Sequence, residues 1–325
     1  RYSARDLAIV RAKQLDVPVV LGTATPTLEM LHHCEMGNYT RLHLPRRAGG
    51  ALPPAMRLID TVRTPATDGI SEPLAAAIGT HLGAGGQALI FLNRRGFAPT
   101  LICSSCGHVA ECDRCDSRLT VHARQRQLRC HHCGHTRPLD DQCGECGEVV
   151  RPLGEGTERL EDTLRQRFPE RRITRIDSDS TQRRGAMIDA LDEAREGSAD
   201  ILVGTQMLSK GHHFPGLSLV GIVNADQGLF GTDFRSAERM AQSIVQVAGR
   251  AGRAERAGEV LIQTAFPENP FWATLIGSGY PGVAAEALTE RETTRWPPFT
   301  RLALIRSAAH RQADARAFLE HARLG

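Results

Sequence analysis

The chain has 325 residues, of which 41% are apolar and 24% are charged, and its formal net charge is +3. This composition is typical of a packed globular protein, so it excludes a wholly disordered chain. No apolar run reaches the roughly 20 residues that a membrane-spanning helix needs, so we expect no membrane partner. The small net charge does not by itself predict a nucleic-acid partner. The length predicts two or three domains.

Strand and helix patterns alternate along the chain. Short apolar runs predict buried strands at residues 19–21, 89–92, 173–176, 201–203, 220–223 and 260–262. Amphipathic spacing predicts helices at 157–168, 181–196 and 235–248. This alternation predicts an α/β fold with a parallel, doubly wound sheet, whose ligands bind at the carboxyl ends of the strands. Both ends of the chain lie in helical patterns, so we expect a piece of a longer protein.

The cysteines give the sharpest signal. Cys34 stands alone in an apolar helical stretch, where we expect a small buried side chain. The other eight form four C-x-x-C pairs, namely Cys103/Cys106, Cys112/Cys115, Cys130/Cys133 and Cys143/Cys146. Two such turns complete a tetrahedral Zn²⁺ site, so four of them predict two zinc sites with four cysteine ligands each. Disulfides and an iron–sulfur cluster are the alternatives, and disulfides fit poorly because nothing else indicates an oxidising compartment.

The spacing between the pairs favours a nested arrangement. Five residues separate the first and second pairs, which is tight for two hairpins around one ion, whereas fourteen separate the second and third. We therefore predict an inner site of Cys112, Cys115, Cys130 and Cys133 and an outer site of Cys103, Cys106, Cys143 and Cys146. Four thiolates leave no open position on a metal, so both ions are predicted to be structural. Four histidines could be ligands and are instead expected beside complete four-cysteine sets: His108, His131, His132 and His135.

Three loops that follow predicted strands or helices carry polar residues. Gly22–Pro26 is rich in hydroxyl groups, and the loop 204–214 holds Lys210, one of only two lysines. Either one could also be an ordinary loop. In the segment 246–253, Arg250 and Arg253 are spaced i, i+3 and are predicted on one face of a helix end, where two glycines remove bulk. Two guanidinium groups presented this way suit a polyphosphate, and the alternative is a solvated basic helix end.

Together these segments resemble a known family. Gly22–Pro26, Phe91–Gly96, Gly204–Phe214 and Gln246–Arg253 occur in the order of motifs III, IV, V and VI of superfamily-two helicases. The cysteine pairs between the second and third segments, with Asn93–Phe97 before them and Asp233–Arg235 after them, make the chain similar to the PriA family of bacterial replication-restart helicases.

The resemblance implies a domain layout. Residues 1–45 would end the first helicase lobe, and residues 266–325 would begin an α+β C-terminal domain that contains Trp296-Pro297-Pro298-Phe299. Residues 46–102 and 148–265 would form the second, RecA-like lobe, interrupted by a zinc-binding insertion at 103–147.

The resemblance also implies an activity, ATP-dependent 3′-to-5′ DNA unwinding that recognises stalled forks and starts primosome assembly. Arg250 and Arg253 would act on the γ-phosphate of ATP as catalytic residues. Nucleotide binding or coupling would involve Thr23, Thr25, Gly204, Thr205, Gln206, Lys210, Gln246 and Gly249. The cofactors would be two Zn²⁺, with ATP and Mg²⁺ in the intact protein. The partners would be single-stranded and forked DNA, single-strand binding protein and other primosome proteins, for a monomer in the bacterial cytoplasm.

Two motifs of such enzymes do not occur in this sequence. It contains no G-x-x-x-x-G-K-[ST] phosphate-binding loop and no Asp-Glu-x-His motif. We expect both upstream of Arg1, so the 325-residue chain alone is expected to have no ATPase activity. The alternative from another class is a non-enzymatic zinc-ribbon adaptor with a vestigial helicase lobe. The intact Arg250 and Arg253 favour the enzyme, because an adaptor has no use for arginines that contact a γ-phosphate.

Overall fold

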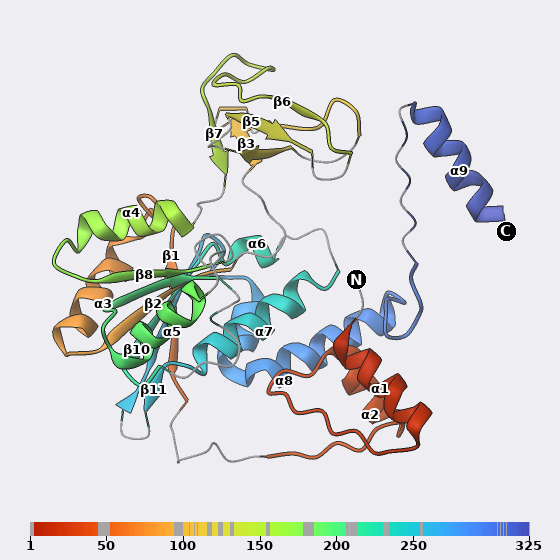
Figure 1. Ribbon diagram of the computed structural model, residues 1–325, viewed down its shortest axis with the longest axis horizontal. Helices are drawn as coiled ribbons and strands as arrows, with labels where there is room; N and C mark the ends of the chain where they lie inside the picture. Colours follow the sequence, from red (N-terminus) through yellow and green to blue (C-terminus); the bar gives the residue numbers. More distant parts are fainter. Residues whose placement is uncertain are drawn as a thin grey trace.

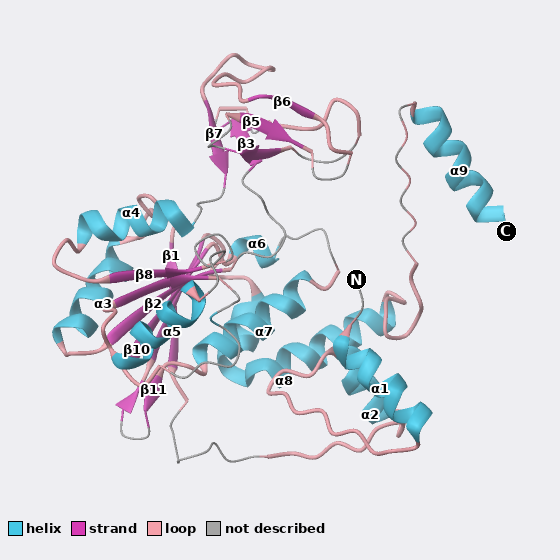
Figure 2. Ribbon diagram, in the orientation of Figure 1, coloured by secondary structure: helices cyan, strands magenta, loops and turns pink. Residues whose placement is uncertain are grey.

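The computed structural model divides into a parallel sheet covered by helices and a smaller module rich in short strands (Figures 1 and 2). It describes residues 3–44, 53–93, 100–103, 105–106, 108, 110–115, 119–122, 126–130, 133–153, 157–177, 185–205, 208, 214–229, 234–253, 256–303, 305, 307, 309 and 311–324.

Six described strands form one sheet in which every neighbouring pair is parallel. They are β1 (Ala55–Asp60), β2 (Gln87–Leu92), β8 (Ile173–Ile176), β9 (Ile201–Gly204), β10 (Leu217–Val223) and β13 (Glu259–Thr264), and their order is β1-β13-β10-β2-β9-β8. Every residue of β2 and β9 is buried, as expected for inner strands of a sheet covered on both faces. The parallel α/β fold and five of the six predicted strands are therefore confirmed.

Helices cover both faces of this sheet. One face packs against α3 (Glu72–Gly83) and α4 (Thr157–Arg167), whose Leu74, Ile78 and Leu160 are fully buried. The other face packs against α5 (Ala186–Glu196), α7 (Ser236–Ala248) and α8 (Pro270–Thr293). The short helix α6 (Asp226–Leu229) follows β10. The helices predicted at 157–168 and 235–248 are confirmed, and the one predicted at 181–196 begins at Ala186, with 178–184 outside the described residues.

The prediction of a strand at 19–21 is wrong. This segment is irregular, and Val20 is 85% exposed. An apolar run forms a strand only beside a hydrogen-bonding neighbour, and no described strand pairs with it. It connects α1 (Ala4–Leu15) to α2 (Leu28–Glu35). Cys34 on α2 is half-buried, so the expectation of a fully buried side chain there is wrong as well, because α2 packs only part of its surface on the rest of the chain.

The segment after the sheet is helical in its described part. α8 carries the fully buried Trp272 in its first turn and shares the core of the sheet. Its regular helix is interrupted at Gly279, two residues before Pro281. α9 (Gln312–Leu324) follows at the end of the chain. Among the described residues of 266–325 there is no strand. No helix in the described part of the chain is long and apolar enough to span a membrane.

The module rich in short strands is inserted between β2 and α4 and projects from one end of the sheet (Figure 1). The antiparallel strands β3 (Thr100–Cys103) and β7 (Val150–Leu153) pair at its base. A second antiparallel sheet consists of β4 (Thr120–His122), β5 (Gln127–Arg129) and β6 (Thr136–Pro138). Because the strand pair β3–β7 brings the two ends of the insertion together, the module can form without breaking the continuity of the parallel sheet.

Candidate functional site

Three of the C-x-x-C turns close in the same way. The backbone N–H of the first cysteine donates to the carbonyl five residues later, at 2.8 Å from Cys103 and at 2.7 Å from Cys130 and Cys143. In the last two turns the residue after the second cysteine is a glycine with a left-handed backbone, Gly134 at φ +78° and Gly147 at φ +75°. Each turn therefore directs two sulfurs toward one point.

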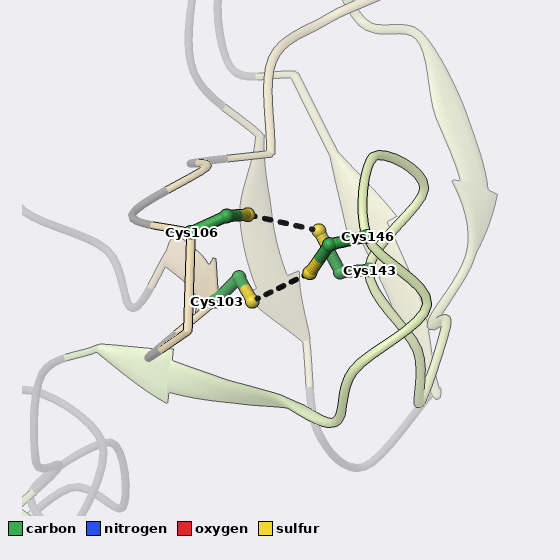
Figure 3. A group of neighbouring side chains, drawn as sticks. All are labelled: Cys103, Cys106, Cys143 and Cys146. Carbon is green, nitrogen blue, oxygen red and sulfur yellow. Dashed lines mark hydrogen bonds between the residues drawn. The ribbon is translucent and has the colours of Figure 1, made fainter.

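The turns assemble into two groups of four sulfurs, each with all its sulfur atoms within 4.8 Å of one another. The outer group is shown in Figure 3, where Cys103 and Cys106 face Cys143 and Cys146. Facing sulfurs are 3.5 and 3.6 Å apart in this group. In the inner group both facing pairs, Cys112/Cys133 and Cys115/Cys130, are 3.5 Å apart.

These distances fit tetrahedral zinc. Zn–S bonds of about 2.3 Å give sulfur–sulfur edges of about 3.8 Å, whereas a disulfide needs about 2.05 Å. The structure thus brings together the nested inner and outer sets, as two zinc-binding sites of four cysteines each. No described histidine belongs to either set. His135 instead lies 3.3 Å from the Asp113 carboxylate, and His131 and His132 fall outside the described residues.

The surroundings of the sulfurs explain why a cation belongs there. Backbone N–H groups of Cys106 and Ser105 donate to the Cys103 sulfur and lower its pKa to about 6, although desolvation opposes them. Burial raises the pKa of the Cys112 thiol to about 12. A thiolate at Cys112 at neutral pH therefore requires a bound cation to compensate for its lost hydration. The apolar core of the module is small, and it includes Cys112 and Cys130 themselves.

A second cluster lies where α7 meets the loop before α2. Nε2 of Gln246 donates to Oγ1 of Thr25 at 2.8 Å, and Thr25 is buried. Oγ1 of Thr23 accepts the backbone N–H of Thr25 at 3.1 Å, which fixes the turn. Two segments that are more than 200 residues apart in the sequence are thus in direct contact.

The predicted geometry of the two arginines is wrong. Helix α7 ends at Ala248, Gly249 caps it, and Arg250 lies in the turn that follows. Arg253 lies instead in β11 (Gly252–Arg253), which pairs with β12 (Arg256–Ala257). The two arginines therefore do not share a helix face. The reason is Gly252, whose φ of +92° no α-helix accommodates. Burial lowers the pKa of Arg250, which nonetheless remains a cation at neutral pH.

The loop after β9 is described only in part. A side chain at Gly204 would approach the Ile176 carbonyl of the neighbouring strand to 2.6 Å, so packing already requires a glycine there. Thr205 accepts a hydrogen bond from the Leu208 N–H through its carbonyl, at 3.0 Å. Gln206 and Lys210 lie outside the described residues, as do Arg94–Phe97.

The structure also reveals residues that the sequence analysis missed. Glu238 and Arg291 form a buried ion pair at 2.8 Å, and Gln242 and Tyr280 hydrogen-bond to each other at 3.1 Å beside it. One signal was available, because Glu238, Gln242 and Gln246 recur every four residues and so form a polar row along one face of the predicted helix.

A parallel, RecA-like sheet that carries two four-cysteine sites on an insertion defines the class, a zinc-containing helicase lobe. Family models agree with this class: "Helicase conserved C-terminal domain" matches residues 152–255, and "PriA DNA helicase Cys-rich region (CRR) domain" matches residues 112–138.

Curated relatives named "Replication restart protein PriA" align over nearly the whole chain. The one from Haemophilus influenzae is 47% identical over 95% of this chain and 42% of its own length. The one from Bacillus subtilis is 40% identical over 94% of this chain and 38% of its own length. The chain belongs to the PriA family, and it spans about two fifths of the length of these relatives. Among solved structures, S. cerevisiae Dbp5 bound to RNA and ADP BeF3 is similar at 12% identity and a TM-score of 0.46, over 88% of this chain and 60% of that one.

Proposed function

We propose that this chain is the nucleotide-responding part of an ATP-driven DNA helicase that restarts replication at stalled forks. The observation that carries the proposal is the hydrogen bond between Gln246 and Thr25. It joins the two segments that resemble helicase motifs VI and III. A helicase needs a direct contact of this kind, because a conformational change at the nucleotide must also move the residues that face DNA.

In this proposal Arg250 and Arg253 contact the γ-phosphate of ATP. Their positive charge favours closure of the cleft between two lobes while the triphosphate is intact, and hydrolysis weakens that attraction. The loop Gly22–Pro26 then moves with α7 because Thr25 is bonded to Gln246. Thr205, Gln206, Lys210 and Gly249 would contact nucleotide or DNA backbone. Mg²⁺ would neutralise phosphate charge when bound.

The substrate would be single-stranded and forked DNA, held mainly through its phosphates and translocated 3′ to 5′ in the bacterial cytoplasm. The two zinc ions would hold the module in shape, because a complete set of four cysteines leaves no open coordination position. The module would then serve contacts with single-strand binding protein and other primosome proteins, for which a metal-stabilised fold outside the motor core is suited.

The test replaces Arg253 with Ala in the full-length protein and measures ATP hydrolysis with and without single-stranded DNA. We expect turnover to be abolished while DNA affinity stays nearly unchanged, because the guanidinium acts on nucleotide. Arg195→Ala, an exposed arginine on α5, is the matched control. The 325-residue chain by itself is expected to hydrolyse no ATP. Loss of DNA binding in Arg253→Ala would identify a strand contact instead, and full-length protein without ATPase activity would favour the adaptor.

A further inference from the structure

A buried ion pair lies where three parts of the chain meet. Glu238, in the first turn of α7, and Arg291, near the end of α8, pair at 2.8 Å with side chains only 4% and 7% exposed. Removing two charges from water costs free energy that their attraction barely offsets, so such a pair is a weak source of stability. Its geometry therefore merits a functional explanation.

The carboxylate of Glu238 holds α2 as well as Arg291. Its Oε1 accepts the backbone N–H of Leu28, the first residue of α2, at 3.1 Å. One and two turns further along the same face of α7, Gln242 and Gln246 bind the preceding loop. Nε2 of Gln242 lies 3.4 Å from the Thr25 carbonyl oxygen, and Gln246 binds the Thr25 hydroxyl. Three side chains with a spacing of four residues thus hold the segment 25–28 along α7.

Arg291 extends the same cluster in the opposite direction. Its Nη1 donates to the carbonyl of Pro297 at 3.2 Å, and its Nη2 donates to the carbonyl of Phe234 at 3.3 Å. Its guanidinium carbon lies 5.0 Å from the centre of the Phe234 ring. That ring packs against Trp296, with the ring centres 4.9 Å apart and the planes tilted by 38°. One side chain therefore joins α8, the residues just before α7 and the segment 296–297.

We propose that Glu238 and Arg291 are positioning residues that fix α7 against the segment 25–28 and thereby hold Gln246 and Arg250 where ATP turnover needs them. Arg250 lies two residues after the end of α7, so any rotation or slide of this helix displaces it. The inference rests on the proposed role of Arg250 and adds how its position is set. The segment 296–297 belongs to the same cluster, because Arg291 donates to the Pro297 carbonyl.

The surface pair between Arg235 and Glu29 provides a matched contrast. It also joins the beginning of α7 to α2, at 2.8 Å, but its side chains are 34% and 27% exposed. Water and salt screen such a pair, so it constrains the helix less. Glu29→Gln therefore removes the same charge from the same junction without disturbing the buried cluster.

The experiment measures DNA-stimulated ATP hydrolysis by full-length protein carrying Glu238→Gln. Glutamine keeps an oxygen for the Leu28 N–H but loses the charge that holds Arg291. We expect kcat to fall about 10- to 100-fold with the KM for ATP little changed, because a small misplacement of a group that stabilises the transition state has this effect. Glu29→Gln is expected to stay near wild type. A wild-type kcat in Glu238→Gln would overturn the proposal.

A double variant separates positioning from general destabilisation. Combined with Gln246→Ala, Glu238→Gln should reduce kcat no further than the worse single variant, because both act by fixing α7 against the segment 25–28, Glu238 through the Leu28 N–H and Gln246 through the Thr25 hydroxyl. Losses that multiply would show a merely structural role and overturn the proposal. If Glu238→Gln does not fold, Arg291→Lys decides, since lysine keeps the charge but lacks the planar fork whose Nη1 and Nη2 donate separately to the Pro297 and Phe234 carbonyls. A wild-type kcat in Arg291→Lys overturns the proposal. Absence of ATPase activity in the wild type would instead refute the proposed function.

Discussion

At Gly147 the backbone adopts a φ of +75°, and this one residue closes the last cysteine turn. Its N–H donates to the carbonyl of Cys143 at 2.9 Å, and the N–H of Cys143 donates to the Glu148 carbonyl at 2.7 Å. The turn also contains Gly144, which has no left-handed backbone and no neighbouring atom within 4 Å of an added Cβ. The two glycines of one C-G-E-C-G sequence thus differ only in the conformation that each must hold.

We predict that Gly147→Ala weakens zinc binding at the outer site, because a side chain costs about 1–2 kcal/mol in the left-handed region. This corresponds to an affinity loss of about 5- to 30-fold. Competition with a chromophoric zinc chelator measures it, with Gly144→Ala as the control, which should bind like the wild type. Equal affinities in the two variants would contradict the prediction.

At the scale of elements, the edge strand β1 is tied to its neighbours by charge as well as by backbone pairing. Glu259 on β13 binds Arg57 of β1, and it binds His81 of α3 at 3.0 Å. Burial alone would raise the pKa of Glu259, but the hydrogen bonds from His81 and Arg57 outweigh it and keep the pKa below its ordinary value. The charged carboxylate is therefore favoured in the folded state.

We predict that Glu259→Gln lowers the free energy of unfolding by less than about 1 kcal/mol at pH 7, as is usual for partly exposed pairs. A folded-state pKa below the unfolded value, which is about 4.3, gives stability that is present above that pH and lost as the pH falls through the folded pKa. Urea unfolding of both proteins at pH 7 and in acid measures the difference, with the exposed Glu268→Gln as control. A difference that grows in acid would contradict this assignment.

At the scale of the whole molecule, the zinc module and the parallel sheet have separate cores. The core of the module is formed by residues between 101 and 150 with four of the cysteines, whereas the sheet packs against its own helices. The strand pair β3–β7 closes the insertion at its base (Figure 2). Loss of one metal is therefore a local event.

We predict that Cys130→Ser in the full-length protein releases one of two zinc ions and loosens residues 112–133, while ATP hydrolysis is spared. Metal content and hydrogen exchange of the module measure the first effect, and a DNA-stimulated ATPase assay measures the second. Cys34→Ser, on α2 and outside both cysteine sets, is the control. A parallel loss of zinc and turnover would show that the module belongs to the motor.

Local patterns in the sequence were enough for much of this fold. Buried strands such as β9 and β10 are continuous apolar runs, and α7 has a clear helical period, so both could be predicted. β1 was missed because its burial is only partial. The segment 19–21 was wrongly predicted as a strand because an apolar run carries no information about whether a partner strand lies beside it.

The sequence by itself determined the parallel α/β fold, the sorting of eight cysteines into two sets and the family, because each rests on residue type and short spacing. Only the tertiary structure decided where α7 ends and which neighbouring strand leaves room only for a glycine at position 204. It also decided that Gln246 contacts Thr25 and that Glu238 contacts Arg291. The last two contacts join residues that are 221 and 53 positions apart. Their formation depends on how helices pack on the sheet, and no local spacing encodes that packing.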